Sequence, residues 1–87
     1  MASYRLVFRR SIAKDLRRIA KPEIHRILSR IDALQHDPRP PGSEKLSGQE
    51  RYRVRQGVYR ILYEIADDIL IVTVVKIGHR KQVYEKR

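Results

Sequence analysis

The 87-residue chain contains no cysteine, which excludes disulfide bonds, thiolate metal sites and a thiol nucleophile. Its three histidines show no HxH or HExxH spacing, so we expect no metal site. It also lacks a glycine-rich phosphate loop, because the Pro-Pro-Gly of residues 40–42 does not have that pattern. We therefore expect no cofactor, and any chemistry must come from ordinary side chains.

Long hydrophobic runs are missing as well. The longest uncharged run, residues 69–75, is far too short to span a bilayer. Arginines interrupt the apolar stretch near the N-terminus, so a signal peptide is not expected. A chain of this length sustains only one core, which predicts a single domain over residues 1–87. The expectation is a cytoplasmic protein without a membrane partner.

Positive charge is abundant. Twenty Lys and Arg against ten Asp and Glu leave a net charge of +10. Such a field attracts polyanions, namely nucleic acid, an anionic membrane surface or an acidic protein. Most of the basic residues are arginine, whose planar guanidinium suits phosphate. A merely solvated cationic surface is the alternative.

The first half of the chain predicts one strand and two helices. Residues 4–8 alternate in hydropathy, as in a short strand. Ser11 can cap a helix over residues 12–19, with apolar residues every three or four positions and Asp15 on its exposed face. Pro22 suits the first turn of a second helix, which Asp37-Pro38 ends.

The second half changes to a hydropathy period of two. This predicts three strands, over residues 52–55, 59–65 and 69–77. Gly57 permits the first turn and Asp67-Asp68 the second. The last of these strands is apolar on both faces, so we expect it to be the central strand, ended by Gly78. Val83-Tyr84 is expected to add a short edge strand.

Together these elements predict an α+β fold of the order β-α-α-β-β-β. A two-helix hairpin packs on one face of a largely antiparallel sheet, and Leu46 holds the proline-containing connector down. The other face receives Arg53, Arg55 and Arg60 and is not fully covered by the chain. We expect a ligand to bind on that face.

Four arginines lie within ten residues, at positions 51, 53, 55 and 60. Arg53 and Arg55 are two apart on one strand and project from the same face. Arg60 returns to the same neighbourhood beyond the Gly57 turn. Like charges this close repel by a few tenths of a kcal/mol or more each, roughly, and a polyanion would neutralise them. The sequence thus predicts phosphate binding by Arg51, Arg53, Arg55 and Arg60, with a solvated strand face as the alternative.

A second cluster follows the last long strand and contains His79, Arg80, Lys81 and Tyr84. Imidazole exchanges protons near neutrality, and tyrosine can stack on a base or carry a proton. A structural role for a lone histidine at a strand end remains open. Glu64 is expected to be a charge partner of Arg60, with a role as general base as the alternative.

The two clusters contain the parts for one metal-free reaction on RNA. The substrate's own 2′-hydroxyl attacks the adjacent phosphorus and leaves a 2′,3′-cyclic phosphate and a free 5′-hydroxyl. This needs a base, an acid and cations for the phosphorane charge.

Two segments carry a recognisable pattern: YRVRQGVYRILYEI at residues 52–65 and VVKIGHRKQVYEKR at residues 74–87. With the KLSG segment at residues 45–48 they make the chain resemble a RelE-type toxin of the RelE/ParE superfamily, over nearly its whole length. The resemblance implies a RelE-like fold and a ribosome-dependent endoribonuclease that cuts messenger RNA in the A site and inhibits translation. It also implies an acidic, RelB-like antitoxin as partner, with operator DNA bound only through that antitoxin.

The family's positions for phosphate binding and charge stabilisation fall on Arg53, Arg55, Arg60 and Arg80. A family tyrosine proposed to stack on or activate the substrate falls on Tyr84. Some members carry lysine where Arg53 and Arg55 stand. Because arginine, with a pKa above about 12, is a poor general base, a proton acceptor would be His79 or Tyr84, and His79 is favoured here. Other members carry lysine at the His79 position, so its role does not transfer automatically.

Two other functions stay open at this level. One is inhibition of DNA gyrase by a ParE-like relative on the same scaffold. The other is a catalytically degenerate member that only binds its antitoxin and, through it, operator DNA. The arginines together with His79 and Tyr84 favour the nuclease.

Overall fold

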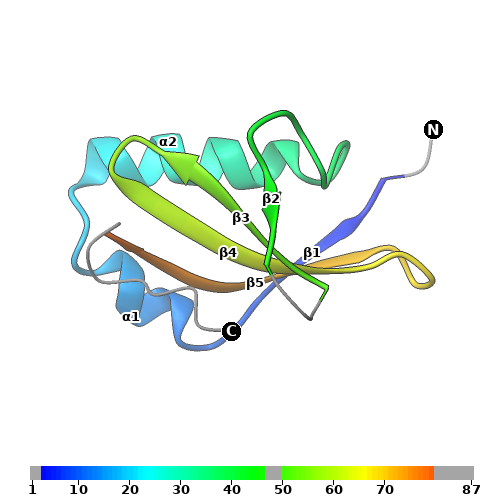
Figure 1. Ribbon diagram of the computed structural model, residues 1–87. Helices are drawn as coiled ribbons and strands as arrows, with labels where there is room; N and C mark the ends of the chain where they lie inside the picture. Colours follow the sequence, from blue (N-terminus) through cyan, green and yellow to red (C-terminus); the bar gives the residue numbers. More distant parts are fainter. Residues whose placement is uncertain (1–2, 47–49, 80–87) are drawn as a thin grey trace.

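Five strands form one sheet in a computed structural model that describes residues 3–46 and 50–79. The elements are β1 (Arg5–Phe8), α1 (Ile12–Leu16), α2 (Lys21–Ala33), β2 (Glu44–Lys45), β3 (Arg51–Gln56), β4 (Tyr59–Ala66) and β5 (Ile71–His79) (Figure 1). The strand order is β1-β5-β4-β3-β2, with β1 parallel to β5 and the other pairs antiparallel. The predicted α+β fold is confirmed, and the two-residue β2 is an addition.

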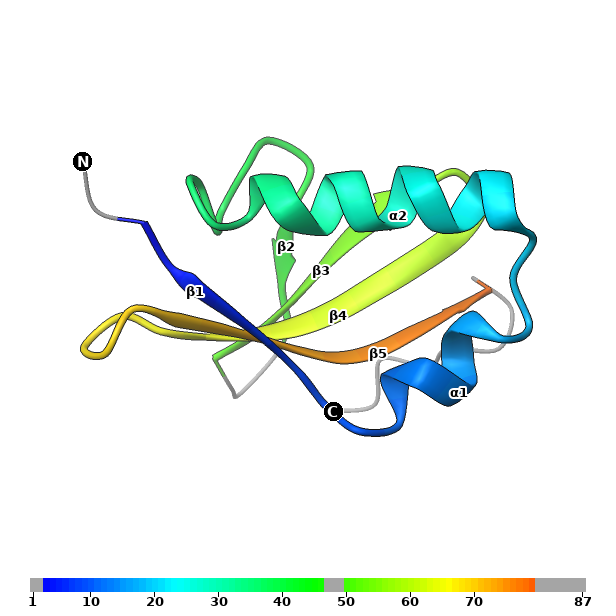
Figure 2. The same ribbon diagram turned by 180° about the vertical axis from the view of Figure 1, so that it is seen from behind.

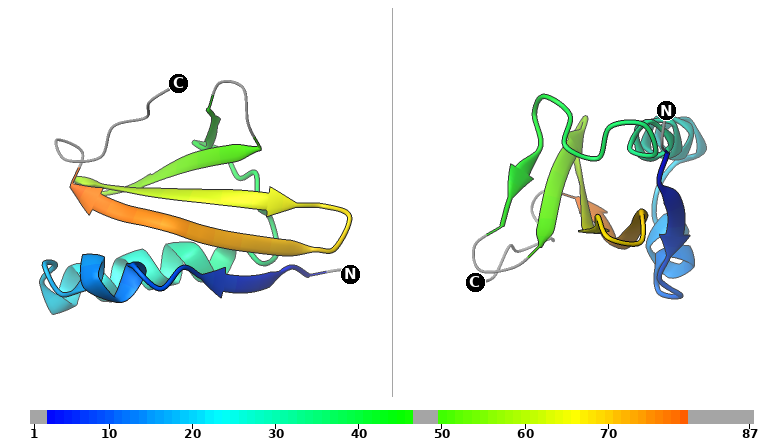
Figure 3. Two further views of the ribbon diagram at one scale, coloured as in Figure 1. Left: turned by 90° about the horizontal axis from the view of Figure 1, so that it is seen from below. Right: turned by 90° about the vertical axis from the view of Figure 1, so that its right-hand side faces the viewer.

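Both helices lie on the same side of the sheet (Figure 3). The longer helix, α2, lies along β3 and β4 (Figure 2), and α1 packs beside β5. Apolar residues of α2 and the turn that follows it, Ile27, Ile31 and Leu34, are spaced four and three apart and are fully buried. They form the core with strand residues such as Tyr63 and Val74. Within the described part of the chain, the opposite face of the sheet, called here the outer face, therefore has no helical cover.

Helix α1 is shorter than its apolar pattern predicts. It starts after Ser11, whose side chain makes no capping hydrogen bond, and it ends at Leu16. The N–H groups of Arg18 and Ile19 then bond to carbonyls three residues back, which tightens the chain. This turn still brings Ile19 into the core.

Strand β5 differs from the prediction in two ways. It is an interior strand, but β4 occupies the middle of the sheet. Gly78 does not end it, because Gly78 pairs with Arg60 and the strand runs on to His79. The register shift between Leu62 and Tyr63 leaves Val75 as an extra residue, which packs with Leu62 and Leu46 in a small second apolar cluster.

That cluster explains why β5 is apolar on both faces and confirms the expected anchoring of Leu46. The predicted turn at Gly57 is also present, with a positive φ of 62° that glycine adopts without strain. The expected edge strand at Val83-Tyr84 lies outside the described residues. No helix in the described part of the chain is long and apolar enough to cross a membrane.

Candidate functional site

The arginines of β3 project from the outer face of the sheet. Tyr52 and Val54 are buried in the main core, so strand alternation turns Arg51, Arg53 and Arg55 the other way. The β3–β4 register sets Arg55 directly opposite Arg60. Arg55 and Arg60, which were expected to lie close together across the Gly57 turn, therefore occupy neighbouring positions in the sheet.

The three arginines of β3 are not equally accessible. Arg55 is exposed, whereas Arg53 is only 8% exposed. Glu44 of β2 lies opposite Arg53 in the register and forms an ion pair with it. The outer face is therefore covered at Arg53, because β2 pairs along β3 at this point and brings a carboxylate to the arginine, but it is open at Arg55.

Arg51 is occupied by a carboxylate of the neighbouring strand. Its Nη2 and Nε lie 2.6 and 3.2 Å from Oε2 of Glu64, which is its direct partner in the register. Arg9 Nη2 lies 3.8 Å from the same oxygen. Glu64 is thus not the partner of Arg60, because four residues along one strand separate the two by about 13 Å.

His79 lies on the helix side of the sheet. It shares strand parity with Ile77, which belongs to the main core, and its ring packs edge-on against Tyr59 at 6.0 Å. Both rings line a cavity of about 400 Å³, which Asp15 and Arg18 also line. The structure thus brings Arg55 and Arg60 together but sets His79 on the opposite face. Arg80, Lys81 and Tyr84 lie outside the described residues.

Asp15 hydrogen-bonds to the part of β5 that extends beyond the end of β1. Strand β1 pairs with β5 only as far as Val74. Further along, Asp15 accepts a hydrogen bond from the backbone N–H of Ile77 at 3.1 Å and from Lys76 Nζ at 2.9 Å. The side chain expected on an exposed helix face instead satisfies a strand edge, because α1 packs against β5.

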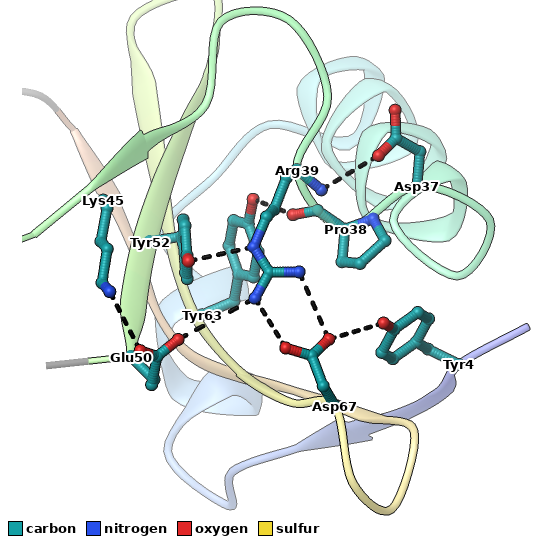
Figure 4. Close-up of polar contacts among 9 residues, drawn as sticks. All are labelled: Tyr4, Asp37, Pro38, Arg39, Lys45, Glu50, Tyr52, Tyr63 and Asp67. Atoms are coloured by element: carbon teal, nitrogen blue, oxygen red, sulfur yellow. Dashed lines mark hydrogen bonds and ion pairs between the residues drawn. The ribbon is translucent and has the colours of Figure 1, made fainter.

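Arg39, to which the sequence pattern assigns no role, is the centre of a polar network at the other end of the sheet (Figure 4). Its Nε donates to the Tyr52 hydroxyl at 3.0 Å, and its guanidinium carbon lies 5.1 Å from the centre of that ring. Both terminal nitrogens donate to Asp67, at 2.8 and 3.3 Å. The Tyr4 hydroxyl donates to the same carboxylate at 2.7 Å. The network joins the connector, β3, the β4–β5 turn and the segment before β1.

These contacts shift the acid–base behaviour of their members. The hydrogen bond to Asp67 raises the pKa of Arg39 above its ordinary value. Hydrogen bonds from Arg39 and then Tyr4 hold the pKa of Asp67 below its usual range. Burial raises the pKa of Tyr63 to about 12, and its hydroxyl donates to the Pro38 carbonyl at 2.7 Å. At neutral pH Arg39 and Asp67 are therefore both ionised, and the Tyr63 hydroxyl beside them keeps its proton.

Replacement of Asp67 by asparagine is expected to make the protein less sensitive to acid. The folded-state pKa of Asp67 is lowered, so its carboxylate adds stability above the unfolded pKa of about 3.9. That stability is lost as the pH falls through the folded pKa. Melting temperatures followed by circular dichroism from neutral to acid pH should fall more steeply for wild type than for Asp67→Asn. The matched control is Asp68→Asn, in the same exposed turn, and equal slopes for wild type and Asp67→Asn would contradict the assignment.

A metal ion would need several histidine or carboxylate side chains placed close together. Within residues 3–46 and 50–79, no three of them are placed to hold a metal ion.

Comparison with known proteins relates this geometry to a group of toxins. The family model described as "ParE toxin of type II toxin-antitoxin system, parDE" matches residues 6–84. A comparison with curated protein sequences gives no significant match.

Solved structures give close matches in fold. The archaeal RelE–RelB complex of Pyrococcus horikoshii OT3 has a TM-score of 0.82 and 26% identity, covering 93% of this chain and 99% of that chain. The RelB–RelE antitoxin–toxin complex of Methanococcus jannaschii has a TM-score of 0.73 and 27% identity, covering 90% and 94%. Free mutant RelE toxin of E. coli has a TM-score of 0.76 and 23% identity, covering 93% and 86%.

Proposed function

The chain belongs to the RelE/ParE superfamily of toxins from type II toxin–antitoxin systems, and we propose that it is a ribosome-dependent endoribonuclease. It would cut messenger RNA in the A site and so inhibit translation. An acidic, RelB-like antitoxin would hold it inactive, as befits a chain with a net charge of +10. Several of the matching RelE toxins, among them those of Pyrococcus horikoshii OT3 and Methanococcus jannaschii, were solved as complexes with RelB.

The observation that carries this proposal is the pair Arg55–Arg60. Like charges directly opposite each other on neighbouring strands destabilise a sheet. A phosphate bound between two guanidinium groups offsets that repulsion and accepts charge-assisted hydrogen bonds from both. Arg55 is exposed on the outer face, which gives a phosphate access to the pair.

The proposed reaction uses the 2′-hydroxyl of the substrate. A bond forms between the 2′-oxygen and phosphorus while the bond from phosphorus to the 5′-oxygen breaks. The arginines, with Arg80 joining Arg55 and Arg60, stabilise the added negative charge on the phosphorane. A base takes the proton of the 2′-hydroxyl, and an acid gives one to the departing 5′-oxygen.

We assign the arginines to charge stabilisation and leave proton transfer to His79 or Tyr84. The placement of the His79 ring on the helix side, against Tyr59, weighs against His79. Lys81 would add a further phosphate contact. Arg51 is the weakest member of the proposed set, because Glu64 already occupies its donors.

The test is to add purified protein to a translating extract and to map messenger RNA ends by primer extension. We expect cuts phased with codons, and we expect them to disappear in the double variant Arg55→Ala/Arg60→Ala. Arg17→Ala is the matched control, because it removes an exposed arginine from the C-cap of α1, on the other side of the sheet. Intact messenger RNA with the wild-type protein would refute the nuclease.

Inhibition of DNA gyrase is the second candidate, since the matching family model describes ParE toxins. The same protein preparation is therefore tested on gyrase supercoiling of a relaxed plasmid. Loss of supercoiling together with intact messenger RNA would replace the first proposal by the second. Absence of both effects would favour a degenerate member that only binds its antitoxin.

A further inference from the structure

Arg30 of α2 lines two neighbouring hollows in the surface. One, of about 280 Å³, is also lined by Gly42, Glu44, Arg53 and Arg55. The other, of about 480 Å³, is lined by His25, Arg26, Ser29, Ala33 and Gln56 besides Arg30. Because they share Arg30, the two hollows adjoin. Together they lead from the arginines of β3 to the flank of α2.

The edge of β3 between these hollows has a free stretch. Strand β2 pairs only with Tyr52 and Arg53. Along Val54 to Gln56, no other strand of the described chain lies on that side of β3. An extended polymer can therefore pass around this edge of β3, from the outer face of the sheet to α2.

The charge along this path is positive. The smaller hollow has three arginines and one carboxylate, Glu44, which is engaged with Arg53. No carboxylate lines the larger hollow. Within residues 3–46 and 50–79, the side chains of Arg30 and Arg55 form no hydrogen bond or ion pair, so both guanidinium groups keep their donors available.

Arg26 is paired with Glu23 at 2.8 Å, but this pair is exposed on the helix surface. Exposed pairs contribute only about 0–1 kcal/mol, so a phosphate can compete with the carboxylate for Arg26. Arg26 and Arg30 are one helical turn apart, which sets them about 6 Å from each other along the axis. The two arginines thus continue the row of cations along α2.

We propose that Arg55, Arg30 and Arg26 form a track for the phosphodiester backbone of single-stranded RNA. The track leads from the Arg55–Arg60 pair around the free edge of β3 onto α2. It rests on the proposed function, since it extends the same RNA away from the cleavage site. Arginines are the cationic side chains along its lining, and guanidinium groups bind phosphate, so the track holds the backbone. The backbone is that of the substrate strand.

The test measures binding of the full chain to a short, dye-labelled 2′-O-methyl RNA. This RNA lacks the attacking hydroxyl, so binding is followed without cleavage. Fluorescence anisotropy at several salt concentrations gives the slope of log affinity against log salt, to which each phosphate contact contributes about −0.7. We expect Arg30→Ala and Arg26→Ala each to flatten the slope by about 0.7. Arg30→Lys, which keeps the charge, and the control Arg17→Ala should retain the wild-type slope.

A parallel cosedimentation with ribosomes identifies the source of the backbone. Weakened binding to both free RNA and ribosomes supports the substrate strand, and weakened binding to ribosomes alone would overturn the proposal, because the track would then hold ribosomal RNA. The track is wrong if Arg26→Ala and Arg30→Ala match Arg17→Ala in both assays. It is equally wrong if the loss is confined to binding of an acidic antitoxin, because the groove would then belong to a protein partner.

The test of the track and the test of the nuclease can fail independently of each other. The codon-phased cuts of the wild-type protein test the nuclease without these variants. If the wild-type protein cuts messenger RNA and the variants keep its salt slope, the track alone fails. If the wild-type protein binds RNA along the track but makes no cuts, the nuclease alone fails.

Discussion

Arg60→Ala is expected to lower the single-turnover rate of messenger RNA cleavage by roughly 100- to 1000-fold, the usual effect of removing one donor that stabilises transition-state charge. Arg60 pairs with Arg55 across the strands and completes the cationic site on the outer face. Arg60→Lys should recover part of the rate, because it keeps the charge but loses the planar pair of donors. Arg17→Ala should cut at the wild-type rate.

The same single-turnover cleavage assay identifies the residue that accepts the proton of the 2′-hydroxyl. Because the His79 ring lies against Tyr59 on the helix side, we expect Tyr84→Phe to lose more activity than His79→Ala. General acid–base groups contribute about 100- to 10,000-fold. A loss of that size in His79→Ala alone would show that the imidazole reaches the RNA despite the face on which it lies. An Arg60→Ala protein that cuts as fast as wild type would remove the basis of the proposed site.

Tyr63→Ala is expected to lower the free energy of unfolding by about 3–5 kcal/mol, as for other large aromatic residues in a core. Tyr63 is fully buried, stacks on Tyr52 with ring centres 5.9 Å apart and donates its hydroxyl to the Pro38 carbonyl. Tyr63→Phe removes only that hydrogen bond and leaves a buried carbonyl without its donor, which costs about 1–3 kcal/mol. Urea unfolding followed by circular dichroism measures both values.

Ile69→Ala is the matched control for this pair of variants. Ile69 is apolar but 62% exposed in the β4–β5 turn, so its loss should change stability by less than about 0.5 kcal/mol. If Tyr63→Phe were as stable as wild type, the hydroxyl would not anchor the connector. The network around Arg39 would then have to hold the connector without it.

Much of the site followed from periodicity. The alternation along β3 and the turn at Gly57 were enough to predict that Arg55 and Arg60 converge. The partner of Glu64 was predicted wrongly, because only the register between β3 and β4 shows that Arg51 faces it. Cover of Arg53 by Glu44 depends on the short strand β2, whose two polar residues carry no periodic signal.

The side on which His79 lies was within reach of the same reasoning. Alternation from the buried Ile77 puts His79 on the core face once the strand continues past Gly78. Because the sequence prediction ends the strand at Gly78, it gives no face of the sheet for His79. The Arg39 network could not be predicted, because its members come from segments that meet only in the folded chain.

The parallel pairing of β1 with β5 has a consequence for the timing of folding during synthesis. Arg5 lies opposite Ile71, so the first strand gains its only neighbouring strand in the described part of the chain after both helices and β2, β3 and β4 have been made. Contacts of such long range make folding slow and keep a growing chain incomplete. The sheet of a nascent chain therefore stays incomplete until β5 has been made, and we expect β1 to remain without a strand partner until then.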